Sequence, residues 1–184
     1  MLNSLLNPIK LPDYSLLKKY EGNGNFSIKN YYNFPHSLFY RHKLRMILDM
    51  MDHKKVYYNI LDYGSGPGIF SKELISKCTR LTSFDKEDIF NPSWKFDLII
   101  CASVLEFVHL DSTLKNLKQI MHLNSRLIVA SPMKTPLSNL YFKSISNHAY
   151  RHSHTEILSK LSKYFIVESK KEWIGLYFSV KCRI

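Results

Sequence analysis

The clearest candidate for chemistry is a glycine-rich loop in the first half of the chain. Residues 60–68 read Ile-Leu-Asp-Tyr-Gly-Ser-Gly-Pro-Gly, so an apolar run ends in Asp62 and three glycines follow at alternate positions. Glycine lets a strand-to-helix turn pass close to a ligand above the carboxyl end of the strand. Phosphate-binding loops fit less well, because a Walker loop needs Gly-Lys-Ser/Thr and the dinucleotide motif needs its third glycine one residue later. The loop predicts a ligand site, although tight turns also use glycine for structural reasons alone.

A second acid, Asp85, stands at the end of the next predicted strand. A carboxylate at this point can accept hydrogen bonds from both hydroxyl groups of a ribose, as in nucleoside-binding sheets. The alternative is that Asp85 caps a helix or a turn. If Asp85 binds a ribose, the site formed with the glycine loop is predicted to take a ligand that contains a nucleoside.

Preceded by Asp62, the Gly-x-Gly-x-Gly loop resembles the first signature motif of class I (Rossmann-like) S-adenosylmethionine-dependent methyltransferases. Residues 96–108 resemble the fourth strand and following loop of small-molecule, type 11-like members, with Phe107 where those members have a histidine. Residues 127–132 resemble the fifth strand, and residues 150–158 resemble the His-rich segment before the last large helix. The resemblance covers about residues 56–182, with four motifs in the family's order.

This resemblance implies S-adenosylmethionine as the cofactor and a role for each matching position. Asp62 and the glycine loop would hold the methionine end, Asp85 the ribose, and residues 86–89 the adenine. Asp88 is either an acceptor for the adenine amino group or a solvated turn residue. The end of the strand at 96–102 would lie beside the sulfonium. The predicted cofactor-binding residues are Asp62, Gly64, Ser65, Gly66, Gly68, Asp85, Lys86, Asp88, Ala102 and Ser103.

The catalytic candidates are histidines, because methyl transfer needs alignment and, for an oxygen or nitrogen acceptor, a way to remove a proton. His109 and His152 are the predicted proton acceptors, and surface or packing roles are their alternatives. A metal site at His148, His152 and His154 is disfavoured, because no carboxylate or thiol stands beside them at ligand spacing. We therefore expect no metal.

The elements that must position these residues follow from changes in hydrophobic period. The core alternates between strands and helices, which predicts an α/β three-layer sandwich with a mostly parallel twisted sheet and an antiparallel last strand. Helices are predicted at 13–20, 37–51, 69–77, 111–122 and 153–164, and strands at 56–62, 80–85, 96–102, 126–131, 165–169 and 174–182, the last two joined by a turn at 170–173.

The segment between Asp85 and Asp97 departs from the family pattern. Only eleven residues separate these acids, where the family has a helix and a further strand. Either one edge strand–helix unit is missing, which leaves six strands, or two strands are fused into one. We expect a single domain over residues 1–184, with residues 1–55 as a helical lid and substrate segment and residues 56–184 as the cofactor-binding core.

The net charge of +11 is concentrated at the two ends of the sequence. Residues 1–60 hold nine basic and four acidic side chains, residues 61–133 hold eight of each, and residues 134–184 hold nine and three. The segments at 31–45 and 134–154 should enclose the acceptor, with Arg41 and His152 on that side. Their positive charge suits an anionic acceptor, and a basic surface without a partner is the alternative.

The expected function is therefore methyl transfer to an O, N or C atom of a small, anionic or lipid-like molecule. The alternatives are an RNA methyltransferase, suggested by the basic ends, and a methyltransferase-like module that binds without catalysis. No transmembrane run or signal peptide is evident, and the three cysteines share no metal spacing. These features predict a cytoplasmic protein with free thiols.

Overall fold

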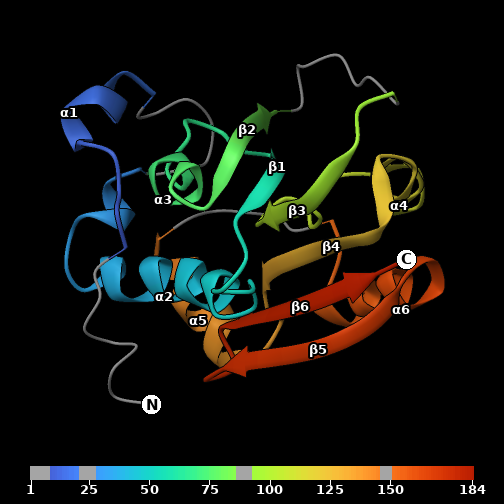
Figure 1. Ribbon diagram of the computed structural model, residues 1–184. Helices are drawn as coiled ribbons and strands as arrows, with labels where there is room; N and C mark the ends of the chain where they lie inside the picture. Colours follow the sequence, from blue (N-terminus) through green and yellow to red (C-terminus); the bar gives the residue numbers. More distant parts are fainter. Residues whose placement is uncertain (1–8, 21–27, 86–92, 146–150) are drawn as a thin grey trace.

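The structure is a computed structural model that describes residues 9–20, 28–85, 93–145 and 151–184 (Figure 1). Within these ranges six strands form one sheet in the order β2-β1-β3-β4-β6-β5. The strands are β1 (Tyr57–Tyr63), β2 (Cys78–Phe84), β3 (Phe96–Ala102), β4 (Met121–Pro132), β5 (Ile166–Trp173) and β6 (Tyr177–Arg183). Neighbours from β2 to β4 pair in parallel, and β6 is antiparallel to both β4 and β5. This topology confirms the predicted mostly parallel sheet with an antiparallel last strand.

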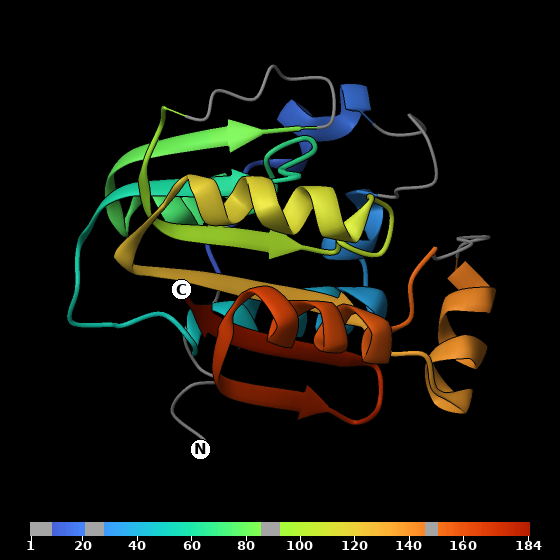
Figure 2. The same cartoon turned by 90° about the vertical axis from the view of Figure 1, so that its right-hand side faces the viewer.

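Helices cover both faces of the sheet. Helices α4 and α6 pack on one face, and Figure 2 shows them in front of it, whereas α1, α2 and α3 pack on the other face. The α-helices are α1 (Tyr14–Leu17), α2 (His36–Leu48), α3 (Ser71–Ile75), α4 (Leu110–Gln119), α5 (Pro136–Ile145) and α6 (His154–Tyr164), and short 3-10 helices span Lys18–Tyr20 (η2) and Ile28–Tyr31 (η3). The result is the predicted three-layer sandwich.

Strand β3 shows why the sheet needs both layers. Leu98 and Ile100 belong to the apolar cluster under α2 and α3, while Ile99 and Cys101 belong to the cluster under α4 and α6. All four side chains have no exposed surface. A strand covered on both faces has no polar side to alternate with, which explains its unbroken apolar sequence.

The order of the strands creates a crevice at the carboxyl ends of β1 and β3. From β1 the chain passes to the outer strand β2 and then returns to β3 on the other side of β1. Ligands of open α/β sheets bind where the winding direction reverses in this way. Figure 2 shows α5 beyond the same end of the parallel strands, to which the β2 and β3 arrows point.

Several element boundaries differ from the sequence-based prediction. Helix α4 begins at Leu110 with His109 as its N-cap and ends at Gln119, whereas a helix over 111–122 was predicted. The last two strands are joined by a turn at residues 174–176, where Ile174 and Gly175 have positive φ angles, and not at 170–173. Helix α3 is shorter than predicted, β4 begins earlier, and α5 was not predicted.

The shortened segment after Asp85 lies partly outside the described residues. Strand β2 is the outermost strand of the described sheet on that side, which agrees with the six-strand alternative. The predicted adenine-binding positions Lys86 and Asp88 fall within 86–92 and lie outside the described residues. Asp85 itself is described, and its position is set by the end of β2 and by the glycine loop bonded to Phe84.

Two further observations concern the chain as a whole. Cys78, Cys101 and Cys182 are free thiols, and the last two are buried. Among the described residues, no helix combines the length and the apolar character that crossing a membrane would need.

Candidate functional site

The glycine loop follows β1 and lies at the crevice. Gly64, Gly66 and Gly68 all have positive φ angles, of 76°, 51° and 76°. The backbone N–H groups of Gly64 and Ser65 both donate to the carbonyl oxygen of Phe84, at 2.6 and 3.2 Å, which ties the loop to the end of β2. Positive φ favours glycine over residues with a side chain, so the sequence Gly-x-Gly-x-Gly is needed for this local conformation.

The glycines differ in what a side chain would meet. A Cβ atom on Gly64 would lie 2.0 Å from Cγ2 of Val104, so this glycine lets the loop pack against the segment after β3. A Cβ on Gly68 would lie 3.0 Å from Oγ of Ser71. A Cβ on Gly66 would meet no atom within 4 Å. Gly66 therefore faces the open side of the loop, where a ligand could lie.

Asp62, just before the loop, is a buried acid with an unused oxygen. Its exposed fraction is 3%. Its Oδ2 atom has no hydrogen-bond partner among the described residues. Burial raises the pKa of this carboxyl to about 7. A buried acceptor without a donor is costly to a fold, which makes this oxygen a candidate to receive a donor from a ligand.

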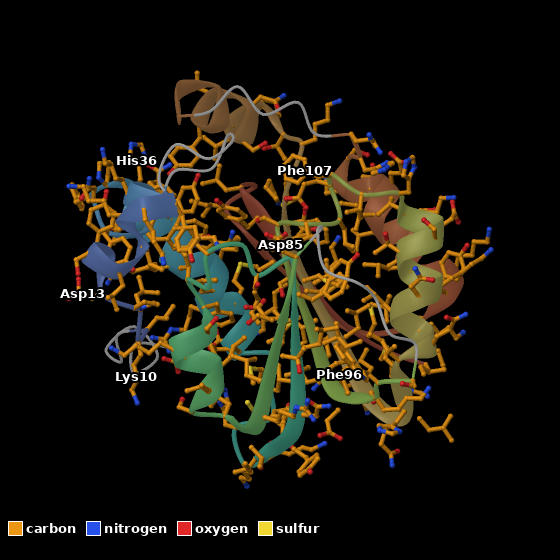
Figure 3. All side chains as sticks on the ribbon, turned by 90° about the horizontal axis from the view of Figure 1, so that it is seen from above. Lys10, Asp13, His36, Asp85, Phe96 and Phe107 are labelled. Carbon is orange, nitrogen blue, oxygen red and sulfur yellow. The ribbon has the colours of Figure 1, made fainter. Side chains whose placement is uncertain are left out.

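Asp85 follows β2 and is exposed. Figure 3 views the molecule from above and shows Asp85 near the ends of the central strands, on the same side as Phe107, with Phe96 at the opposite end of β3. The backbone link between Phe84 and the glycine loop brings Asp85 next to that loop. The two predicted cofactor acids thus flank the same turn from adjacent strands.

The chain after β3 forms the other wall of the crevice. Ser103, which follows Ala102, has a φ of 60°, a rare conformation for a residue other than glycine. Its backbone N–H donates to the carbonyl of Ala130 in β4 at 2.7 Å. Its Oγ accepts a hydrogen bond of 2.9 Å from Nζ of Lys43, which belongs to α2.

Lys43 is one of the basic residues in the segment at 31–45 that the sequence analysis placed beside the acceptor, and the structure buries it next to the crevice. Its side chain is 3% exposed, and Nζ also donates to Oη of Tyr31 at 3.1 Å. The rings of Tyr31, Tyr40 and Tyr177 surround Nζ, with centroids 5.6, 5.7 and 5.8 Å away. Such rings attract a cation through their electron-rich faces. Lys43 counted among the basic residues of α2, and no spacing rule in the sequence indicates that this lysine, unlike Arg45, points inward.

Glu106, four residues after Ala102, is a second buried acid that sequence reasoning missed. It is 1% exposed, Oε2 accepts from Oγ of Ser131 at 2.9 Å, and Oε1 has no partner among the described residues. Burial raises its pKa to about 7, against the lowering effects of Ser131 and Lys43. The available signal was its position as the single acid within the apolar run at 104–108, next to the buried Leu105.

The structure brings His109 and His152 together, in a separate pocket of about 370 Å³ between the beginnings of α4 and α6. Nδ1 of His152 lies 2.7 Å from Oε1 of Glu156, and Nε2 lies 3.0 Å from the carbonyl oxygen of Val108. Both ring nitrogens of His152 therefore face acceptors, and neither presents a lone pair to a substrate. The lining residues of the pocket are His109, Leu110, Asp111, Ser112, His152, Glu156 and Lys160.

The metal alternative has no support in the described part of the chain. No group of three His, Cys, Asp or Glu side chains there could hold an ion. Nδ1 of His154 accepts from the backbone N–H of Lys134 at 2.9 Å, so this histidine ties α6 to the segment before α5. His148 lies outside the described residues.

Comparison with known proteins gives matches in structure only. No protein-family model and no curated protein sequence matches the chain. The N-methyltransferase NodS from Bradyrhizobium japonicum WM9, in complex with S-adenosyl-L-homocysteine, superposes with a TM-score of 0.63 at 16% identity, over 92% of this chain and 97% of that one. DhpI in its SAM–HEP complex superposes with a TM-score of 0.63 at 14% identity, over 100% of this chain and 97% of DhpI. A putative type 11 methyltransferase from Sulfolobus solfataricus superposes with a TM-score of 0.54 at 20% identity, over 67% of this chain and 82% of that one.

Proposed function

Because the chain has the fold of class I S-adenosylmethionine-dependent methyltransferases, we propose that it binds S-adenosylmethionine and transfers its methyl group to a small molecule. The observation that carries this proposal is the buried Asp62 with an unused oxygen, placed directly before the Gly64–Gly68 turn at the crevice. Similar structures that hold S-adenosylhomocysteine or S-adenosylmethionine support the same ligand.

The residues present fit this cofactor at three points. Asp62 offers an acceptor to the ammonium group of its methionine part, and Gly66 leaves open space beside the loop for that part to lie in. Asp85 offers a carboxylate to the ribose hydroxyls from the end of the adjacent strand. Gly64 serves the site indirectly, because it lets the loop close against Val104. Gly68, Ser65, Ala102 and Ser103 complete the two walls, and Lys86 and Asp88 stay predictions for the adenine.

S-adenosylmethionine, when bound, supplies a methyl group on a positively charged sulfur, which is a good leaving group. The protein then has to align an acceptor and exclude water. Helix α2 and the segment after β3 would exclude water, because the Lys43–Ser103 and Lys43–Tyr31 contacts close the crevice on the side of the N-terminal segment. On the basis of the same contacts, we also propose that residues 1–55 serve as a lid.

For the acceptor we favour a small molecule over RNA. Two of the basic residues expected to attract an anion are committed to the fold, since Arg41 donates to the carbonyl of Tyr31 at 2.9 Å and Lys43 is buried. Arg151 remains exposed, with Nη1 3.4 Å from Nε2 of His109. An exposed positive surface for a nucleic acid backbone would use such groups, and here fewer are available than the sequence indicates.

The proposal is tested by isothermal titration calorimetry with S-adenosylmethionine and S-adenosylhomocysteine. The wild-type protein should bind both at one site. Asp85→Ala removes a charge-assisted hydrogen bond and should weaken both by about 10- to 100-fold. Asp49→Asn, which changes an exposed acid paired with Lys171, is the matched control and should bind as the wild type does. Absence of binding in folded wild-type protein would refute the proposal.

A module that binds without catalysis is the second candidate, favoured by the short connection between Asp85 and Asp97. It differs from an enzyme in one measurable respect. Such a module would bind both ligands but would not convert S-adenosylmethionine to S-adenosylhomocysteine with any acceptor in an extract of the source cells.

A further inference from the structure

The amine of Lys43, which joins α2 to the crevice, has no chemical role in the function proposed above. Two oxygens accept hydrogen bonds from Nζ, Oγ of Ser103 at 2.9 Å and Oη of Tyr31 at 3.1 Å. A protonated lysine has three N–H donors, whereas a neutral amine has two and a lone pair. The two acceptors match the two donors of the neutral amine, whose lone pair then needs no partner among the described residues.

Among the described residues, no anion stands close to Nζ to balance the charge of a protonated amine. No carboxylate lies within 4.0 Å of it in the described part of the chain. The groups that face it are the tyrosines Tyr31, Tyr40 and Tyr177 and, at longer range, Glu106. Burial lowers the pKa of Lys43, and Tyr40 and Glu106 oppose this only in part. Since the pKa of Glu106 is itself raised to about 7 by burial, this acid carries its full negative charge only above that pH.

The geometry points to Lys43 as the base of methyl transfer, a neutral amine on helix α2 that receives the proton of the acceptor beside Ser103. This inference rests on the proposed function, and in particular on Ser103 lying next to the sulfur of the cofactor. It replaces His109 and His152 in that role, because both nitrogens of His152 are already bonded and the pocket of the two histidines does not include the glycine loop.

The transfer balances with this assignment. The bond between the acceptor atom and the methyl carbon forms while the carbon–sulfur bond breaks, and the electron pair of that bond stays on sulfur. The proton of the acceptor atom passes to the lone pair of Nζ. A positive charge therefore disappears from sulfur as one appears on Lys43, and for an uncharged acceptor the total charge of the buried site does not change. A site of low dielectric favours a reaction without net charging.

A purely structural Lys43 would instead hold Ser103 in its positive-φ conformation. The two roles differ in how charge on Nζ affects ligands. A sulfonium beside a protonated lysine is repelled, whereas the uncharged sulfur of S-adenosylhomocysteine is not. If Lys43 is the base, the ratio of the two dissociation constants depends on pH. If Lys43 only holds the conformation of Ser103, the ratio does not depend on pH.

The experiment measures the dissociation constants of S-adenosylmethionine and S-adenosylhomocysteine by calorimetry in a pH series from 6 to 10.5, the ordinary pKa of a lysine amine, below which burial shifts Lys43. In the wild type the ratio of the first to the second should fall by about tenfold as pH rises and Lys43 loses its proton. Lys43→Met should give the low ratio at every pH, and Lys43→Arg, which stays charged, the high ratio at every pH. Lys55→Met is the matched control, because Lys55 also lies over a tyrosine ring, that of Tyr57, but is exposed.

The amine of the cofactor titrates too, but it does so in every variant, so the comparison is between proteins. Lys43→Gln serves as a further neutral variant if the apolar replacement does not fold. If both ligands bind and the ratio changes with pH alike in the wild type and the Lys43 variants, Lys43 is not the base although the proposed function stands. If neither ligand binds to the folded wild type, both proposals are overturned.

Discussion

Nζ of Lys43 in helix α2 lies 2.9 Å from Oγ of Ser103, the residue that follows the last position of β3. This hydrogen bond joins the N-terminal part of the chain to the crevice of the sheet. Tyr31 extends the link, because its Oη accepts from the same nitrogen while its carbonyl accepts from Arg41. The N-terminal helices are therefore part of the candidate site.

Asp62→Asn should stabilise the protein without ligand and weaken cofactor binding. The folded-state pKa of Asp62, about 7, exceeds its ordinary value of 3.8, so the folded protein holds more protons than the unfolded one between these values. Stability should then fall as pH rises through this window and level off above about 7. At pH 8 the variant should be more stable than the wild type by about 1–3 kcal/mol, as expected when a buried unpaired charge is removed.

Chemical denaturation at pH 5 and pH 8 checks this prediction. Glu106→Gln should behave similarly, since burial also raises its pKa to about 7. The exposed Glu172, paired with Lys170, provides the control Glu172→Gln, which should leave the pH dependence unchanged. An Asp62→Asn protein less stable than the wild type at pH 8 would show that the carboxylate has a partner.

Gly64→Ala and Gly66→Ala should have different effects. The Cβ of the first would lie 2.0 Å from Val104, so the loop must move and stability should fall by several kcal/mol. The second meets no atom and should cost only about 1 kcal/mol through its positive φ, while it weakens cofactor binding. Thermal unfolding and calorimetry separate these effects, and Gly64→Ala combined with Val104→Ala should recover part of the lost stability. Equal destabilisation by both single variants would argue against this division of roles.

His152→Ala should destabilise the fold by about 1–2 kcal/mol, because it removes the contact of Nε2 with the carbonyl oxygen of Val108, in the segment after β3, and the contact of Nδ1 with Glu156 in α6. The affinity for S-adenosylmethionine should stay within about threefold of the wild type, since His152 belongs to a pocket outside the glycine loop. Calorimetry on the folded variant measures this. A much larger loss of affinity would place His152 at the cofactor.

Ser153→Ala should cost about 0.5–2 kcal/mol of stability, because Oγ of Ser153 caps α6 by accepting from the N–H of Glu156 at 3.3 Å. Ser159→Ala, at an exposed position within the same helix, is the matched control and should cost less than 0.5 kcal/mol. Denaturant unfolding of the two variants tests the cap, and equal losses would mean that Ser153 does not contribute through it.

The sheet and its ligand-binding end could be predicted because local patterns determine them. The apolar runs of β1, β3 and β4 and the glycine loop have signatures within a few residues. Ser153 and Glu156 have the spacing of a capping box, which predicts a helix from 153, and the structure confirms this cap of α6. The expected fold class is therefore confirmed, whereas the roles of the individual site residues stay predictions.

The inward position of Lys43 and the buried state of Glu106 could not be predicted in the same way. Lys43 reaches Ser103 across sixty positions of the sequence, and Glu106 meets Ser131 across twenty-five. Such contacts depend on how α2 and the strand ends pack in three dimensions. The predicted turn at 170–173 is wrong for a different reason: these mostly polar residues belong to the exposed strand β5, and Gly175 with its positive φ forms the turn after them.

The central claim, methyl transfer to a small molecule, is tested most directly with S-adenosylmethionine labelled with tritium on its methyl group. The protein is incubated with this cofactor and an extract of the source cells, and the extract is then separated into small molecules, RNA and protein. The account predicts label in the small-molecule fraction, strongly reduced with Asp85→Ala and unchanged with Asp49→Asn. Label in the RNA fraction, or no transfer by a wild-type protein that binds the cofactor, would contradict it.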